Sequence, residues 1–344
     1  MRVPGSEGRP GVFRAFGDAQ MAADPPARRQ VISARVLSVR AVTLRRPLAL
    51  LATFTLIACA ASVPVGPLVG RADGPPMRRA DLDGIGVAYT VEGPDGAPPV
   101  VLVHPWAGST RVWDAVAPAL ARDHRVIRID LPGHGASDKP DVRYDIPLAA
   151  RAVERVLDAL GLPRVTLIGN SLGGAVVLTV ANDRPERVDR LVLIDALGGG
   201  PVPAFFAFFI DRWFTAPMFY GVDDGLIERF AEWFVFEATG PWTDAFLSQL
   251  LSMRASPEGW AYSRSVTQYL RNATGFDATP WLAFVRAPTL VVWGDDDVVI
   301  APSAGRHLAA SIPGARLEVL EGCGHMPEVE CPEALLPLLT AFLR

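Results

Sequence analysis

The chain has 344 residues, half of them hydrophobic, and a formal net charge of −4. Residues 1–80 carry 12 arginines against four acidic residues, whereas residues 81–344 carry 21 basic against 33 acidic residues. The larger part is therefore acidic and lacks the basic surface of a nucleic-acid-binding protein, so no nucleic-acid partner is expected. The length suits one large α/β domain or two smaller ones.

The first part of the chain differs from the rest. Residues 1–46 are rich in Arg, Gly and Pro, which is typical of a disordered or non-native leader. The uncharged stretch 47–70 predicts a signal peptide, a lipoprotein signal or a membrane anchor. Its "LIAC" resembles a bacterial lipobox ending in a lipidated Cys59. We therefore expect export to the cell envelope or secretion, with a cytoplasmic protein as the alternative. Residues 71–83 are typical of a linker.

Apolar strands and amphipathic helices alternate through the rest of the chain. Strands are expected at 86–93, 99–104, 125–130, 164–169, 190–195, 288–294 and 315–322. Helices are expected at 112–123, 144–161, 172–185, 301–312 and 332–344. An aromatic-rich, mostly helical stretch at 198–283 interrupts this rhythm. The order predicts an α/β fold, with a mostly parallel sheet, helices on both faces and one helical insertion.

A serine between glycines, in "GNSLGG", stands where a strand is expected to meet a helix. This G-x-S-x-G pattern is typical of a nucleophile elbow, whose sharp turn requires small residues at Gly169 and Gly173. The helix that begins at Leu172 would direct its N–H groups and the positive end of its dipole at the Ser171 oxygen. Ser171 is therefore the candidate nucleophile, and a plain tight turn is the alternative.

A serine nucleophile needs a base and an acid, and the chain offers one good base but several acids. His325 follows the last expected strand, at the carboxyl edge of the sheet, where a base can reach another strand end. Asp295, Asp296 and Asp297 follow one strand, and Asp195 ends another. The residues alone leave the choice among these four carboxylates open.

Five segments in order resemble the α/β-hydrolase fold superfamily: "HPWAGS", "DLPGHGASD", "GNSLGG", "WGDDD" and "GCGHMPEVECPE". The resemblance covers residues 84–344 and implies an α/β-hydrolase domain with a helical cap at 198–283. It implies that Asp297 is the acid, because the family's acid stands three residues after the strand-end glycine. It also implies that His325 is the base, in the chain order Ser, Asp, His.

The resemblance further implies an oxyanion hole made by the backbone N–H groups of Trp106 and Leu172. Trp106 would also contact the substrate. Pro105 stands where relatives usually carry glycine, and proline has no N–H, but the donor is the following residue. His104 and His134 are expected to be buried, hydrogen-bonding residues rather than catalysts.

These observations predict a serine hydrolase that cleaves carboxylic esters of apolar substrates through a Ser-His-Asp triad and an acyl-enzyme. Hydrolysis of carbon–carbon bonds or amides with the same triad remains an alternative, as does a non-catalytic binding member of the fold. The aromatic residues of 198–283 favour an apolar pocket. The histidines are scattered without ligand spacing, so no metal or organic cofactor is expected.

Two cysteines, Cys323 and Cys331, flank His325. In an exported protein they could pair and brace the loop that carries the base. We nevertheless expect two free thiols, because the Cα separation that a disulfide needs cannot be read from the sequence.

Overall fold

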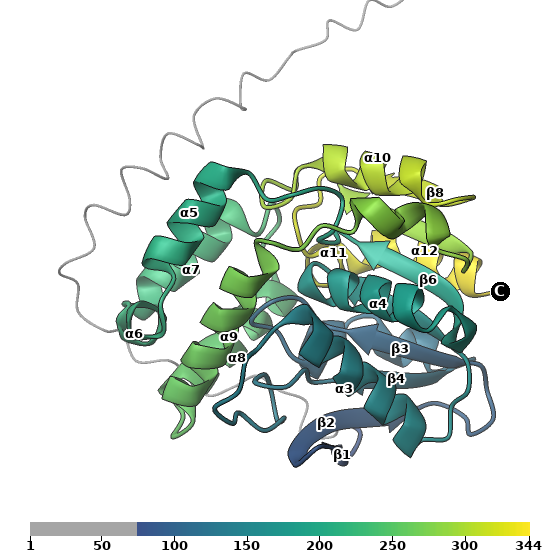
Figure 1. Cartoon of the computed structure of the whole chain (residues 1–344), viewed down its shortest axis with the longest axis horizontal. Helices are drawn as coiled ribbons and strands as arrows, with labels where there is room; N and C mark the ends of the chain where they lie inside the picture. Colours follow the sequence, from purple (N-terminus) through teal and green to yellow (C-terminus); the bar gives the residue numbers. More distant parts are fainter. Residues whose placement is uncertain (1–73) are drawn as a thin grey trace, which may run out of the picture. The chain divides into compact units, whose positions relative to one another are not determined.

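A computed structural model describes residues 74–344 of the chain (Figure 1). The leader at 1–46, the apolar stretch 47–70 with Cys59, and the first residues of the expected linker lie outside the described residues. Within the described part, no helix is both long and apolar enough to cross a membrane.

One sheet of eight strands forms the centre of the described part (Figure 1). The strands are β1 (Arg78–Leu82), β2 (Ile85–Glu92), β3 (Pro99–Val103), β4 (Arg125–Ile129), β5 (Val165–Asn170), β6 (Val188–Ile194), β7 (Thr289–Gly294) and β8 (Arg316–Leu320). Their order in the sheet is β1-β2-β4-β3-β5-β6-β7-β8. β2 is antiparallel to both of its neighbours, and all pairs from β4 to β8 are parallel. The predicted α/β fold with a mostly parallel sheet is confirmed.

The first strand, β1, was not predicted. Residues 71–83 read as a linker, but Arg78–Leu82 pairs with β2 along its whole length. Only Ala80 and Leu82 of this strand are apolar and buried, while its charged residues face solvent. Such a short, charged strand is typical of a sheet edge and gives almost no apolar signal. The linker interpretation is therefore wrong for these five residues.

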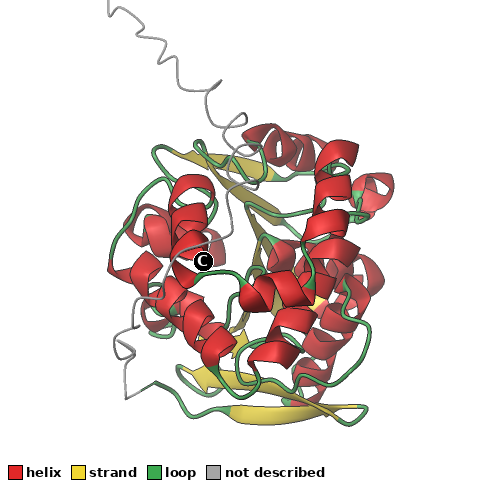
Figure 2. Cartoon of the chain, turned by 90° about the vertical axis from the view of Figure 1, so that its left-hand side faces the viewer, coloured by secondary structure: helices red, strands yellow, loops and turns green. Residues whose placement is uncertain are grey.

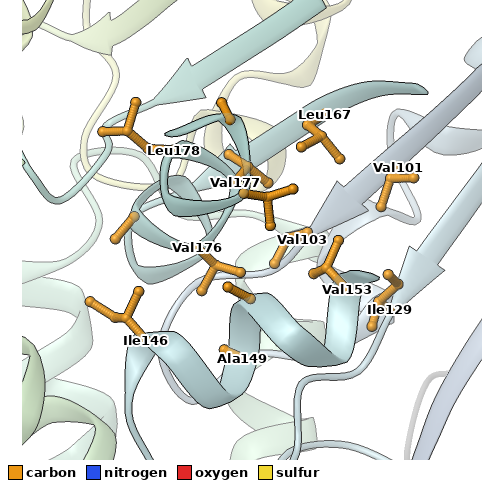
Figure 3. Packing of buried hydrophobic residues seen from close by; sticks show 14 of the residues in the cluster. Val101, Val103, Ile129, Ile146, Ala149, Val153, Leu167, Val176, Val177 and Leu178 are labelled. Atoms are coloured by element: carbon orange, nitrogen blue, oxygen red, sulfur yellow. The ribbon is translucent and has the colours of Figure 1, made fainter. Parts of the chain in front are cut away.

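Alternate residues of the parallel strands enter two separate clusters of buried side chains. Val101 and Val103 of β3 lie in one cluster with side chains of α3 (Ile146–Ala159) and α4 (Leu172–Asp183), among them Val153 and Val176 (Figure 3). The opposite face of β3 belongs to the cluster that includes α12 (Pro332–Leu343). Helices therefore cover both faces of the sheet, with α10 (Pro302–Ser311) on the same side as α3 and α4.

One helix expected at 112–123 is instead two short pieces. A 3₁₀ turn covers Thr110–Trp113, and α2 covers only Ala117–Leu120. Pro118 would lie in the interior of a continuous helix, where proline removes a hydrogen bond and clashes with the preceding turn. A new helix that starts one residue before this proline avoids both problems.

Five helices connect β6 to β7, within the stretch that was expected to be helical (Figures 1 and 2). They are α5 (Ala204–Trp213), α6 (Ala216–Gly221), α7 (Asp224–Phe234), α8 (Pro241–Ala255) and α9 (Gly259–Ala273). We call these helices and their connections, residues 204–273, the cap. A 3₁₀ segment, Thr279–Phe284, then leads back into β7.

Candidate active site

The turn between β5 and α4 holds Ser171 in a strained conformation. Its φ of 52° and ψ of −114° lie outside the regions that side-chain-bearing residues normally adopt. A Cβ on Gly169 would lie 2.3 Å from the carbonyl oxygen of Gly173, and a Cβ on Gly173 would lie 2.2 Å from that of Val103. Both positions therefore require glycine, which explains the glycines on either side of the serine.

The structure brings Ser171, His325 and Asp297 together, although they are far apart in the sequence. His325 Nε2 lies 2.9 Å from Ser171 Oγ, and His325 Nδ1 lies 2.8 Å from Asp297 Oδ2. His325 stands between β8 and α11 (Pro327–Glu330), in the loop where it was expected. All three residues are buried. This arrangement can pass a proton from the serine hydroxyl to the histidine.

The loop after β7 fixes the carboxylate of Asp297. Its Oδ1 accepts hydrogen bonds from the backbone N–H groups of Val299 and Ile300, at 2.8 and 3.0 Å. The other oxygen is thereby turned toward His325. Asp295 and Asp296 are exposed, and Asp295 accepts a hydrogen bond from the N–H of Gly322. The loop thus places only one of its three carboxylates against the histidine.

Asp195, the fourth candidate acid, is a buried neighbour of this group. Its Oδ1 accepts a hydrogen bond from the N–H of Gly294 at 2.9 Å. Burial, with the nearby charge of Asp297, raises the pKa of Asp195 well above its usual range. Single ligand atoms of Asp195, Asp297 and His325 lie within 4.8 Å of one another, a spacing that would also suit a metal ion. Both nitrogens of His325 are, however, already hydrogen-bonded to Asp297 and Ser171.

Two backbone N–H groups were expected to form an oxyanion hole. Leu172 is the first residue of α4, and the first N–H groups of a helix have no partner inside it. No backbone carbonyl within residues 74–344 accepts a hydrogen bond from the N–H of Trp106. The indole of Trp106 donates instead to the carbonyl of Val266 in α9, at 2.6 Å. Within residues 74–344, neither of these two backbone N–H groups has a backbone acceptor, which is what the expected oxyanion hole requires.

His104 has the structural role that the sequence predicted. It is fully buried, its Nε2 accepts the N–H of Leu131 at 3.0 Å, and its Nδ1 lies 2.8 Å from the carbonyl oxygen of Pro105. Burial lowers the pKa of His104, and it lowers the pKa of the equally buried His134 further. Both rings are therefore neutral at physiological pH.

Cys323 and Cys331 form a disulfide, so the expectation of two free thiols is wrong. Their Cα atoms are 6.2 Å apart, within the range that a disulfide can bridge. The reason is the short helix α11, which folds the chain back on itself between the two cysteines. The bond closes a loop that contains His325.

Three side chains that hold the catalytic loops were missed in the sequence. They are Asn170, Tyr262 and Glu330. Asn170 Nδ2 donates to the carbonyl of His325 at 3.1 Å, across 155 positions of sequence. All three contact backbone atoms of distant segments, and such contacts leave no local motif. Only the position of Asn170, directly before the serine, offered a signal.

A nucleophile elbow on one strand of a mostly parallel sheet, with an acid and a histidine following later strands, defines the α/β hydrolases. The chain belongs to this family, since the model of the alpha/beta hydrolase fold matches residues 98–330. Both the recognised resemblance and the predicted enzyme class are confirmed: the protein is a hydrolase.

The similar proteins are named for different substrates. The chain is 31% identical over 282 residues to 2-hydroxy-6-oxononadienedioate/2-hydroxy-6-oxononatrienedioate hydrolase 2 of Pseudomonas putida, covering 78% of this chain and 94% of that protein. A membrane phospholipase A is 28% identical with a TM-score of 0.69, covering 78% of this chain and 85% of its own. An N-acyl homoserine lactone degrading enzyme is 29% identical with a TM-score of 0.63, covering 77% and 100%.

Proposed function

We propose that this hydrolase cleaves carboxylic esters of apolar substrates through a covalent acyl-enzyme. The observation that carries the proposal is the hydrogen-bonded series from Ser171 Oγ through His325 to Asp297, with distances of 2.9 and 2.8 Å. His325 accepts the serine proton as Oγ attacks the carbonyl carbon of the ester. Asp297 holds the Nδ1–H tautomer and stabilises the imidazolium that forms.

The tetrahedral intermediate carries a negative oxygen, which the N–H groups of Trp106 and Leu172 stabilise. His325 then gives its proton to the leaving alcohol, and the acyl group stays on Ser171. A water molecule gives a proton to His325 and attacks this acyl-enzyme. The same oxyanion hole is used again, and the carboxylic acid product leaves with Ser171 restored.

The apolar substrate is supported by aromatic side chains next to the expected oxyanion donor. The Trp106 ring packs edge-on against Phe214 and Phe219, with ring centroids 6.3 and 5.7 Å away. Such a wall suits an apolar acyl or alcohol group. An N-acyl homoserine lactone contains a cyclic ester as well as an amide, so the similarity to an enzyme that degrades it is compatible with ester cleavage. The Pseudomonas putida relative favours a second candidate, hydrolysis of a carbon–carbon bond with the same triad.

Labelling with a fluorophosphonate, combined with p-nitrophenyl esters of increasing chain length, tests this proposal. We expect labelling at Ser171, release of p-nitrophenol, and loss of both in Ser171→Ala. Hydrolysis that survives Ser171→Ala would refute the mechanism. A labelled enzyme that is inactive on esters but cleaves a 2-hydroxy-6-oxo-dienoate would establish the carbon–carbon reading. Absence of both labelling and turnover would indicate a binding protein.

We also propose that the protein is attached to a membrane of the cell envelope through residues 47–70 or a lipid on Cys59. The support is the uncharged composition of this stretch and its "LIAC" motif. Metabolic labelling of the full-length protein with a tagged fatty acid, in wild type and in Cys59→Ser, tests the lipid form. Recovery of all the protein in the soluble cytoplasmic fraction would refute attachment.

A further inference from the structure

The cap makes hydrogen bonds to the loop that carries the expected oxyanion donor. The hydroxyl of Tyr262 in α9 donates to the carbonyl of Ala107 at 2.8 Å. The adjacent Trp106 donates its indole N–H to the carbonyl of Val266, one turn further along α9. Ser109 Oγ donates to the side chain of Gln249 in α8 at 2.8 Å. Three side-chain hydrogen bonds thus connect two cap helices to three positions within the loop segment 106–109.

One of these bonds acts on a strained residue. Ala107 has a φ of 57°, in the left-handed region that costs free energy for any residue with a side chain. Strain of this kind persists only where the surroundings hold it. Tyr262 is fully buried, and burial raises the pKa of its hydroxyl, so it remains a neutral donor. Without that donor, the carbonyl of Ala107 would lose its partner and the loop would be free to relax.

The cap also makes hydrogen bonds to the loop that carries the base. The backbone N–H of His325 donates to the carbonyl of Val235, just after α7, at 3.1 Å. The Glu330 carboxylate accepts four backbone N–H groups at 2.7 to 3.2 Å. Two of these N–H groups, those of Gly324 and Met326, flank His325. The other two belong to Glu237 and Ala238 of the cap. One carboxylate therefore joins the cap to the base loop on both sides of His325.

We propose that Tyr262 and Glu330 are positioning residues through which the cap holds both catalytic loops in their reactive geometry. The inference rests on the proposed serine mechanism. It implies that the cap stays seated on these loops during turnover, because lifting it would break the bonds that set the oxyanion site and the base. The cap is then part of the catalytic framework and not a lid that opens for each substrate molecule.

Tyr262→Phe removes one hydroxyl and little else, and α9 supplies a matched control. Tyr269 lies on the same helix and is fully buried, but its hydroxyl has no hydrogen-bond partner among the described residues. Tyr262→Phe should lower kcat about 10- to 100-fold with KM within twofold, because it disturbs an oxyanion donor. Tyr269→Phe should stay within twofold of wild type. Circular dichroism and melting of each variant verify folding at the assay temperature.

Inhibition by a boronic acid separates positioning from general destabilisation. A boronate on Ser171 resembles the tetrahedral intermediate, so its inhibition constant for Tyr262→Phe should rise by the same factor as kcat/KM falls. Glu330→Gln tests the proposal independently, because the NH₂ group of the new glutamine would face backbone N–H donors and could not accept their hydrogen bonds. It should lower kcat at least 10-fold, with the exposed Glu333→Gln as control.

Three results would overturn the inference. The first is a folded Tyr262→Phe with wild-type kcat and boronate affinity. The second is an equal loss in Tyr262→Phe and Tyr269→Phe. The third is a folded Glu330→Gln with wild-type kcat. A wild-type enzyme that neither labels nor hydrolyses esters would instead refute the proposed function, and this inference with it.

Discussion

A buried glutamate near the base should make the stability of the protein depend on pH. Glu328 lies in α11, three residues after His325, and is fully buried. Neither of its carboxylate oxygens has a hydrogen-bond partner within residues 74–344. Burial raises the pKa of Glu328 from 4.5 to about 8, so the folded protein carries this group in its neutral form at pH 7.

The sign of the effect follows from proton binding. Above pH 4.5 the unfolded chain releases this proton while the folded protein keeps it until about pH 8. The free energy of unfolding therefore falls as the pH rises through this window. One proton corresponds to about 1.4 kcal/mol per pH unit, and the full window to about 5 kcal/mol. Glutamine cannot ionise, so Glu328→Gln should lack this contribution.

Guanidinium unfolding of wild type and Glu328→Gln at pH 5, 6, 7, 8 and 9 measures the difference directly. Other titrating groups, such as Glu330, are present in both proteins and largely cancel. We expect the variant to gain stability relative to wild type by about 1.4 kcal/mol per pH unit up to pH 8, and no more beyond it. Glu333→Gln, at an exposed site, should follow wild type. Parallel curves for wild type and Glu328→Gln would refute the reasoning.

Three further predictions concern the site itself. Asp297→Asn should lower kcat for ester hydrolysis by about 10⁴, because the correct histidine tautomer is lost. Asp295→Asn, at an exposed site, should keep the wild-type kcat. Equal losses of kcat in the two variants would contradict the assignment of Asp297 as the acid. Gly173→Ala should abolish labelling of Ser171 and cost about 1–3 kcal/mol by denaturation, since its Cβ would meet a carbonyl oxygen at 2.2 Å. Cys323→Ser should cost about 2–3 kcal/mol because the bond closes a loop with a sequence separation of eight, and an unchanged denaturation midpoint would contradict this.

Much of the fold followed from the sequence because buried parallel strands are almost continuously apolar. The runs at 99–104 and 164–169 correspond to β3 and β5 within two residues. The edge strand β1 was not predicted, because only two of its five side chains are buried. A strand or helix that buries few side chains has a weak hydrophobic pattern, so the sequence gives little evidence for it.

The sequence predicted the order of nucleophile, acid and base along the chain, but the residues alone did not identify which aspartate is the acid. Four carboxylates followed two strand ends, and only the resemblance to a family pointed to Asp297. The structure supplies a physical reason, since the loop after β7 turns just one of its three carboxylates inward. The prediction of two free thiols was wrong for a related reason. The helix α11 folds the chain back between Cys323 and Cys331 and so brings the two cysteines together, which the sequence alone does not show.

The two buried acids, Asp195 and Asp297, show why environment decides between residues that the sequence presents as equals. Both lie beside His325, and two adjacent carboxyl groups in a buried site do not both ionise readily. Asp297 has two backbone N–H donors on one oxygen and His325 on the other, whereas Asp195 has a single donor and an unpartnered second oxygen within the described residues. Burial, with the nearby charge of Asp297, raises the pKa of Asp195 well above its usual range, so Asp195 keeps its proton, whereas Asp297 is the carboxylate that contacts His325. Under the proposed mechanism, this division supplies one charge to balance the imidazolium, on the carboxylate that already contacts its Nδ1.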